Sequence, residues 1–369
     1  MTPVPMTSKL NALHTFALLF AFLLGTSIIF GTPKVVYDTW MVDLTALLPS
    51  VLLFLLFAGM ISLGKNKSLY ALFIRAWGNW VGSLLIACYV TYFIYIATRN
   101  VRDMLELVLT SLLHDTPTHV LAAVFVLLSV YAAAGGVRVI GRLAVMVACM
   151  VMLFFFALGI MLYFSRSIDI ERIFPVLSQG MGPVVKSAFT NSIWYPYGEM
   201  IVFLALFPKI GDAKQFRKIG LIALLSTAAV LTFSDLLQIY ALGIENQRFS
   251  VFALLDAARL INLFDFITRM DALVALMIIF GVLIKCSVFI YAGARGASFL
   301  FHRRSQNFQL PLALLIGASS ILVTKNTAEH VEEGLKYVIY WLHIPLQLVI
   351  PSITILVYKI RYRKGRATT

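Results

Sequence analysis

The sequence predicts an all-α protein that crosses a membrane about ten times. Hydrophobic residues make up 60% of its 369 residues, charged residues make up 13%, and the mean hydropathy is +0.90. Soluble globular domains are markedly less apolar and more charged. The apolar residues also form runs of the length that a helix needs to cross a bilayer, about 20 residues. We therefore expect a single transmembrane domain over residues 1–369.

Ten apolar segments, taken in chain order, are the expected spans, and the ninth is the shortest. They cover residues 12–35, 43–63, 79–98, 118–134, 143–165, 184–207, 219–242, 271–293, 310–324 and 335–358. Two linkers, 99–117 and 243–270, mix charged with apolar residues. Such a mixture suits amphipathic helices that lie on the membrane surface.

Lysine and arginine are spread unevenly over the loops between these spans. If the N-terminus is cytoplasmic, that side holds 18 of the 30 basic residues and one acid, Asp212, whereas the other side holds 11 basic residues and 14 of the 17 acids. Positive loops stay in the cytoplasm, so both termini are predicted to be cytoplasmic. The net charge of +13 then indicates contact with the anionic lipid bilayer. We expect no nucleic-acid partner, because the basic residues are scattered and lack an aromatic-lined groove.

Enzyme chemistry finds no support in the motifs. The six histidines show no metal-ligand spacing, and no glycine-rich phosphate loop follows a strand. We therefore predict no catalytic residue, no metal and no cofactor.

The sixth span contains an unusual group of residues, Trp194-Tyr195-Pro196-Tyr197-Gly198-Glu199. Proline removes a helical hydrogen bond, and a carboxylate is poorly solvated by hydrocarbon. These residues predict a break in a helix that lines a site.

The first span carries a similar interruption, Gly25-Thr26-Ser27 followed by Gly31-Thr32-Pro33. Small residues permit an unwound stretch whose backbone groups can point at a ligand. The alternative is helix packing, in which such residues are also common.

The two interruptions lie five spans apart, which places them at corresponding positions of two five-helix repeats. The repeats would cover about 12–165 and 184–358, followed by a basic cytoplasmic tail, 359–369. An odd number of spans inverts the topology of the second repeat. This predicts a LeuT-like inverted-repeat fold with broken helices 1 and 6, which binds a small solute between them at the membrane midplane.

Several stretches resemble the endospore germinant-receptor B-subunit family, a branch of the amino acid-polyamine-organocation transporter superfamily. They are Leu24–Pro33, Leu112–Pro117, Tyr131–Arg142, Phe174–Pro183, Gly198-Glu199 and Arg269–Asp271. The similarity covers nearly the whole chain and includes the basic tail. Two departures bear on the ligand: the family's usual Gly-small-Gly in span one is Gly25-Thr26-Ser27 here, and Thr32-Pro33 replaces its more common Leu-Pro.

The resemblance implies a ten-span inverted-repeat fold and a role in sensing germinants such as amino acids, sugars or nucleosides. It also implies partnership with an A subunit and a lipoprotein C subunit in the inner membrane of a spore. A cell-membrane location is the alternative.

Three charges are expected inside spans: Glu199, Lys285 and Asp235. Glu199 could bind a ligand amine, carry a coupling proton, or serve as a structural partner of freed backbone N–H groups. Lys285 lies 14 residues, roughly 21 Å, along a helix from Asp271, too deep to reach the interface. It could bridge span eight to the break in span one or form an ion pair with Glu199 or Asp235. For Asp235, hydrogen bonding within the bundle is favoured over ligand binding.

The candidate ligand-binding residues flank the two breaks, and the aromatic ones could form a pocket wall. They are Gly25, Thr26, Ser27, Trp194, Tyr195, Tyr197, Gly198 and Glu199. The preferred function is a membrane subunit of a spore germinant receptor that binds a small polar solute and signals through partner subunits. A proton-coupled amino acid transporter is the alternative, and a structural subunit with a vestigial pocket is a third possibility. Pocket motifs do not separate the first two, because both bind a solute.

Overall fold

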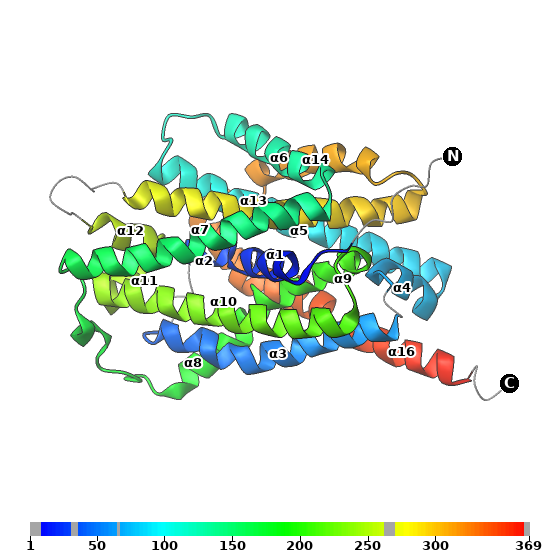
Figure 1. Ribbon diagram of the computed structural model, residues 1–369, viewed down its shortest axis with the longest axis horizontal. Helices are drawn as coiled ribbons and strands as arrows, with labels where there is room; N and C mark the ends of the chain where they lie inside the picture. The colour runs from blue at the N-terminus through cyan, green and yellow to red at the C-terminus, as the bar shows by residue number, and fades with distance from the viewer. Residues whose placement is uncertain (1–8, 31–35, 65–66, 262–269, 365–369) are drawn as a thin grey trace.

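The computed structural model describes residues 9–30, 36–64, 67–261 and 270–364, which form helices packed side by side. The long helices run along the longest axis of the molecule (Figure 1). No strand occurs in the described residues, which agrees with the predicted all-α class.

Six helical runs in this described part are long and apolar enough to cross a membrane, judged by length and composition. They are α3 (Thr39–Leu63), α5 (Asn79–Ser111), α7 (Val137–Phe164), α10 (Ala213–Leu242), α13 (Met270–Phe301) and the run Thr327–Arg361. That last run comprises α15 (Thr327–Glu333), the π-helical η5 (Gly334–Val349) and most of α16 (Ile350–Lys364). Two shorter apolar helices are α1 (Ala12–Leu24) and α6 (Thr118–Ala134). The other helices of six or more residues are α4 (Leu69–Trp77), α8 (Met181–Ser187), α11 (Ile244–Phe249), α12 (Ala253–Arg259) and α14 (Gln306–Leu322).

Helix boundaries follow local signals in the sequence. Asn11 caps α1 by accepting the His14 backbone N–H at 2.8 Å, and Asp212 caps α10 through the Gln215 N–H at 2.8 Å. Gly136, with φ of +76°, separates α6 from α7, a backbone conformation that glycine adopts without a Cβ clash. The predicted spans 118–134 and 219–242 therefore lie within helices, and 143–165 ends one residue beyond α7; the ends of these helices are set mainly by caps and glycines.

The prediction that residues 99–117 form a surface linker is wrong. Helix α5 continues without interruption to Ser111, and Arg99, Asn100 and Asp103 on it are buried. These polar side chains face other helices of the bundle, where they find partners, so the mixed pattern marks a polar interior wall and not a membrane surface. The helix predicted to end at residue 98 therefore continues for about three and a half more turns.

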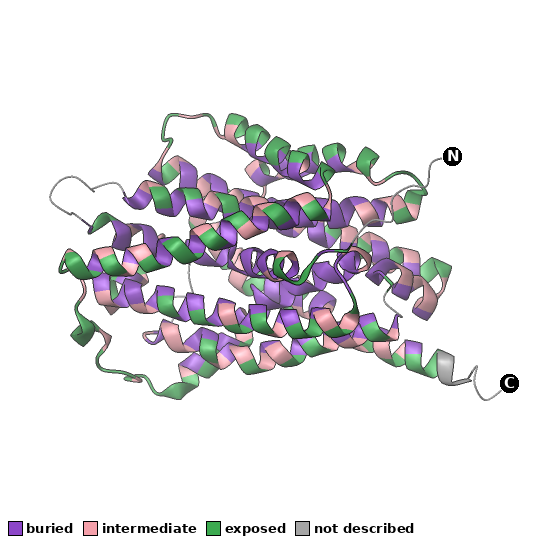
Figure 2. Ribbon diagram, in the orientation of Figure 1, coloured by how far each residue is buried: buried purple, intermediate pink, exposed green. Residues whose placement is uncertain are grey.

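The second predicted linker, 243–270, contains α11 and α12, and residues 262–269 lie outside the described part. The apolar residues Leu254, Leu255 and Ala258 of α12 are buried against the bundle. Figure 2 shows the general pattern: buried residues face the centre of the bundle, and exposed ones line its outer helices.

Helix α1 lies at the centre of the bundle, with α7, α10 and α13 packed around it. Its last eight residues, Ala17 to Leu24, are all buried, as a helix that is apolar on every face requires. It ends at Leu24, and the helix resumes as α2 at Ser27, with the short segment Ser27–Phe30 described. The first span is therefore interrupted at Gly25-Thr26, whereas the expected Gly31-Thr32-Pro33 lies outside the described residues.

The predicted sixth span is interrupted as well. A π-helical turn (η2, Ala188–Ser192) follows α8, and turns through Pro196 lead into a 3-10 helix (η3, Tyr197–Ile201) and then α9 (Val202–Leu206). The Gly198 N–H donates to the carbonyl of Ile193, five residues earlier, at 2.8 Å, where an α-helix would use the residue four earlier, and the Tyr195-Pro196 peptide is cis. Pro196 cannot donate a helical hydrogen bond, which accounts for the break at this point.

Candidate functional site

A cavity of about 640 Å³ lies between α5, the break after η2, the segment following α11, and the run α15–η5. Apolar side chains of η5 and α5, including Ile96 and Val338, form part of its wall. Its polar and charged lining comes from Arg99, Asn100, Asp103, Asn191, Tyr195, Glu199, Arg248, His330, Glu332 and His343.

An ion pair lies at the deep side of this cavity. The Lys285 Nζ of α13 lies 2.6 Å from Glu199 Oε2, and the two side chains are 0% and 2% exposed. The same Nζ donates to the Thr26 hydroxyl at 2.8 Å and lies 4.7 Å from the Tyr195 ring centroid. Both helix breaks and α13 therefore meet at one ammonium group. Lys285 thus pairs with Glu199, one of the two carboxylates considered for it, and its contact with the first-span break is made through the side-chain hydroxyl of Thr26.

The ammonium connects onward to the cavity wall. Thr26 donates its hydroxyl to Asn100 Oδ1 at 3.2 Å, and Asn100 lines the cavity. The Asn100 Nδ2 group is buried without a hydrogen-bond partner among the described residues. A buried amide donor without a partner costs free energy unless a ligand or water supplies an acceptor.

Close backbone packing makes this meeting of helices possible. A Cβ on Gly25 would lie 3.1 Å from the Gly281 carbonyl oxygen and 3.2 Å from Lys285 Cδ. Glycine at both positions lets α13 approach the break in the first span.

Charged side chains of α5 and α15 form the next layer of the cavity. His330 Nε2 lies 2.7 Å from Asp103 Oδ1, and Arg99 donates to the His330 carbonyl and lies 3.7 Å from Glu333. Thr327 at the start of α15 donates to Glu106 Oε2 at 2.7 Å. These contacts hold α15 against α5 along one edge of the cavity.

A third polar cluster ties α5 to η5 behind the break. Tyr92 lies 2.7 Å from His343 Nδ1, and the Gln347 amide donates to the Tyr92 hydroxyl at 2.7 Å. A Cβ placed on Gly198 would lie 1.9 Å from Gln347 Oε1. Gly198 therefore leaves room for the buried Gln347 amide, which is a physical reason for glycine at this position.

The candidate residues named from the sequence take different places. Tyr195 and Glu199 line the cavity, and Thr26 reaches its wall through Asn100. Gly25 packs on α13, and Ser27 donates to the Leu23 carbonyl at 3.0 Å.

The remaining candidates do not line this cavity. Trp194 donates its indole N–H to the Phe189 carbonyl at 2.9 Å and so holds the π-helical turn. Tyr197 is buried where the charges of Asp43 and Asp235 act on it, and Gly198 receives Gln347. Asp235 is buried in α10, apart from the ion pair.

Sequence reasoning missed Arg99, Asn100, Asp103 and His330. A signal for three of them was available, because residues 99, 100 and 103 share one face of a helix, and nothing between Asn79 and Ser111 breaks that helix. His330 comes near them only through the fold.

These features define a class: a helical, multi-pass membrane protein with a charged internal cavity at two helix interruptions. A family model described as "Spore germination protein" matches residues 9–330. The chain belongs to this spore germination protein family, which confirms the family expected from its sequence motifs.

Individual relatives agree with the family match. The chain is 31% identical over 348 residues to Spore germination protein KB of Bacillus subtilis (strain 168), covering 93% of each protein. It is 29% identical over 143 residues to Spore germination protein A2 of the same organism, covering 38% of each. It is 23% identical to Spore germination protein GerQB of Bacillus cereus over 253 residues, covering 68% of each.

Proposed function

We propose that this protein is the membrane subunit of a spore germinant receptor and binds a small polar solute in the cavity at Glu199. The observation that carries the proposal is a cavity of about 640 Å³ that includes a buried, ion-paired carboxylate where two interrupted helices meet. Clefts and cavities of this size with a few converging polar groups suit small molecules. Charges inside membrane helices are costly and are usually retained for function.

The groups left without protein partners suggest the chemistry of the solute. Glu199 pairs with Lys285 through Oε2, Asp103 pairs with His330 through Oδ1, and among the described residues the buried Asn100 Nδ2 donates no hydrogen bond. The cations nearby are engaged: Lys285 with Glu199 and Thr26, and Arg99 with α15. A carboxylate has about four acceptor sites on its two oxygens, so Glu199 and Asp103 favour an ammonium or hydroxyl groups, and the Asn100 amide donor favours a carbonyl or carboxylate. An amino acid has both kinds of group.

The fold we propose has ten spans in two inverted five-helix repeats, about 12–165 and 184–358, with the LeuT-like arrangement. The two interruptions, at Gly25-Thr26 and around Pro196, support it because they fall at corresponding positions. Both termini would be cytoplasmic, with the basic tail 359–369 at the spore inner membrane.

Signalling would follow from differential binding. A solute that binds one of two conformations more tightly shifts the equilibrium by its difference in binding free energy. The contacts between α5 and α15 border the cavity and could change with occupancy. Partner A and lipoprotein C subunits would read that change. Neighbouring reading frames that encode such proteins would support the receptor.

A melting-temperature screen of the purified protein against amino acids, sugars and nucleosides tests solute binding, since a ligand of the native state raises apparent stability. We expect a saturable rise with at least one solute. Glu199→Gln removes the negative charge and should raise the half-saturating concentration of that solute about a hundredfold, the size expected for a lost charge-assisted contact.

The matched control is Glu171→Gln, which changes an exposed acid outside the cavity and should respond as the unaltered protein does. Because Glu199→Gln also alters the ion pair, Asn100→Ala serves as a second variant that removes the free amide donor. Unchanged solute responses in both Glu199→Gln and Asn100→Ala would contradict binding at this cavity.

A proton-coupled amino acid transporter is the second candidate, and the buried Lys285–Glu199 pair favours it, since a pair that exchanges a proton can couple transport. An uptake assay in vesicles that contain the purified protein distinguishes the transporter from the receptor. Accumulation of a labelled solute under a proton gradient would support transport, whereas binding without accumulation would favour the receptor function.

A further inference from the structure

A second, smaller cavity lies at the C-terminal end of α13, away from the first. It measures about 340 Å³ and is lined by Arg295, Ser298, Phe299, His302 and Ser305. Arg295, Ser298, His302 and Ser305 are spaced three or four residues apart, so the polar groups follow one face of the chain as α13 ends. None of them takes part in the cavity at Glu199.

Arg295 is the unusual member of this group. Within the described residues its guanidinium makes no hydrogen bond or ion pair, and its Nε is buried without a partner. A partly buried guanidinium without an acceptor is costly, because its donors lose water and gain nothing in return. Its planar array of donors matches the oxygens of a phosphate or carboxylate.

Two further positive charges lie near Arg295. Arg138 at the start of α7 and Lys209 of η4 (Phe207–Lys209) come close enough for their charges to act on one another. Burial, and then the charges of Arg295 and Arg138, lower the pKa of the Lys209 ammonium. Three cations from three elements therefore lie within reach of one another's charge, which favours an anion nearby.

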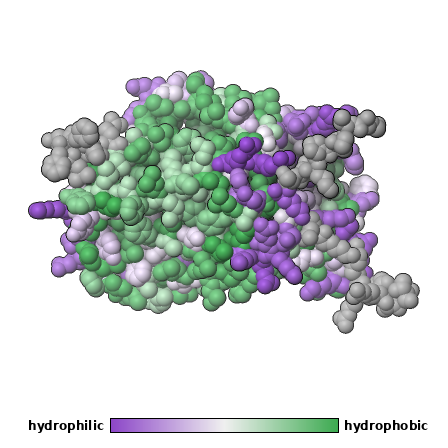
Figure 3. Space-filling view, in the orientation of Figure 1, coloured by the Kyte–Doolittle hydropathy of each residue, from purple (hydrophilic) through white to green (hydrophobic). Residues whose placement is uncertain are grey.

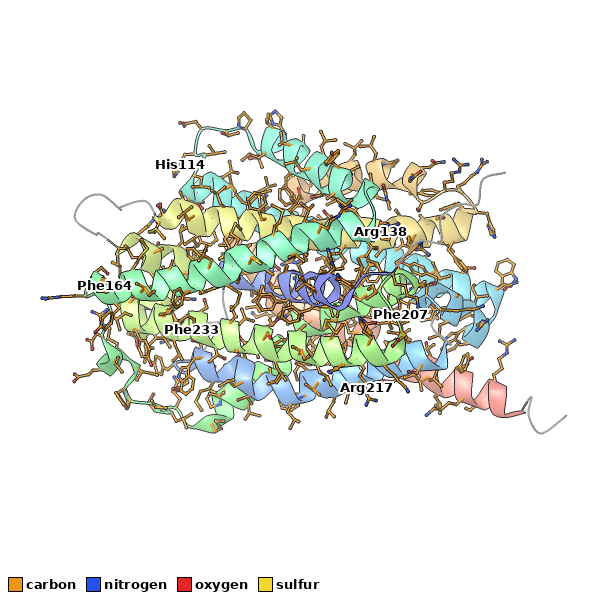
Figure 4. The ribbon with its side chains drawn as sticks, in the orientation of Figure 1. His114, Arg138, Phe164, Phe207, Arg217 and Phe233 are labelled. Carbon is orange, nitrogen blue, oxygen red and sulfur yellow. The ribbon has the colours of Figure 1, made fainter. Side chains whose placement is uncertain are left out.

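The position of Arg295 along α13 corresponds to the depth of lipid headgroups. From Asp271 near the start of α13 to Arg295 there are 24 residues, about 36 Å of helix, slightly more than the hydrocarbon core of about 30 Å. Figure 4 shows Arg138 and Phe207 toward the same end of the bundle, far from Phe164. On the face in Figure 3, hydrophilic side chains gather toward that end, beside a broad hydrophobic region.

We propose that the pocket at Arg295 binds the phosphate of an anionic phospholipid headgroup. The guanidinium supplies the hydrogen-bond donors, and Arg138 and Lys209 supply attractive charge. Apolar side chains border the pocket: Phe299 is 39% exposed, and the exposed Phe301 stacks on Phe308 with ring centroids 5.7 Å apart. Acyl chains can cover such rings, whereas free phosphate would not.

The test uses the purified full-length protein in detergent, titrated with short-chain phosphatidylglycerol while its melting temperature is followed. Phosphatidylcholine with the same chains and sodium phosphate are the comparison probes. We expect a saturable rise in melting temperature with phosphatidylglycerol and little change with the other two. In Arg295→Gln the half-saturating lipid concentration should rise about tenfold or more, the size expected for a lost bidentate phosphate contact.

The matched control is Arg304→Gln, which removes an exposed arginine at the same end of α13 and should titrate as the unaltered protein does. If Arg295→Gln does not fold, Arg295→Lys retains the charge without the planar array of donors and should bind the lipid with intermediate strength. Equal loss in Arg304→Gln, an equal response to phosphatidylcholine, or a response to sodium phosphate as large as that to the lipid would overturn the proposal.

Discussion

The ion pair between Lys285 and Glu199 offers the most direct test of how the interior is held together. Replacing Lys285 with methionine keeps much of the side-chain volume but removes the ammonium, which lies 2.6 Å from Glu199 Oε2 and 2.8 Å from the Thr26 hydroxyl. At an effective dielectric constant of about 20, two unit charges at this separation attract by about 6 kcal/mol before the cost of desolvation. Removing one partner of such a buried pair typically costs about 3–5 kcal/mol, because the remaining charge is left without compensation.

The expected result is a loss of about 3–5 kcal/mol in the free energy of unfolding for Lys285→Met, measured by denaturant titration in mixed micelles. The double variant Lys285→Met/Glu199→Gln should recover part of that loss, because no charge then remains unpaired. Lys336→Met is the control, since Lys336 forms a pair with Glu332 in which both side chains are more than half exposed, and it should leave the free energy of unfolding nearly unchanged. A loss in the double variant equal to or larger than that in Lys285→Met would refute the reasoning that an uncompensated charge is the cause.

Two further predictions concern the other polar clusters around the cavity. Gly198→Ala should destabilise the protein by about 1–3 kcal/mol, because its Cβ would meet the Gln347 amide, and Gln347→Ala in the same chain should relieve part of the loss in thermal unfolding. Equal melting temperatures for the unaltered protein and Gly198→Ala would show that the Gln347 amide can move away without cost. Asp103→Asn removes the carboxylate that lies 2.7 Å from His330 Nε2, and it should lower the free energy of local opening of α15 by about 1–3 kcal/mol. Amide hydrogen exchange should then become faster in α15 while it stays unchanged in α10. An equal increase in both helices would contradict a local stabilisation of α15 by this contact.

The interruptions in the first and sixth spans were predictable because proline and glycine act locally. Pro196 lacks a donor in any helix, and Gly25-Thr26-Ser27 combines residues that tolerate an unwound backbone. The structure has a helix end at Leu24 and turns through Pro196. The sequence also limited the ion-pair partner of Lys285 to Glu199 or Asp235, because a buried ammonium requires a carboxylate partner and these are the two acids expected inside spans.

The cavity wall was not predictable in the same way. Arg99, Asn100 and Asp103 carry the composition of a surface segment, and only burial against α15 distinguishes them from one. His330 lies 227 residues from Asp103 in the chain, so no local pattern connects the two. Gly198 was read as a helix breaker, but its close approach to Gln347 depends on how η5 packs.

By itself, the sequence determined the membrane class, the family and the positions of the helix interruptions, because hydropathy and backbone chemistry are properties of short stretches. Only the tertiary structure decided which charges meet. Lys285, Glu199 and Thr26 come from three separate segments, and the cavity beside them depends on α15 packing against α5. Contacts between residues distant in the chain result from the packing of whole helices, which sums many weak interactions along their faces.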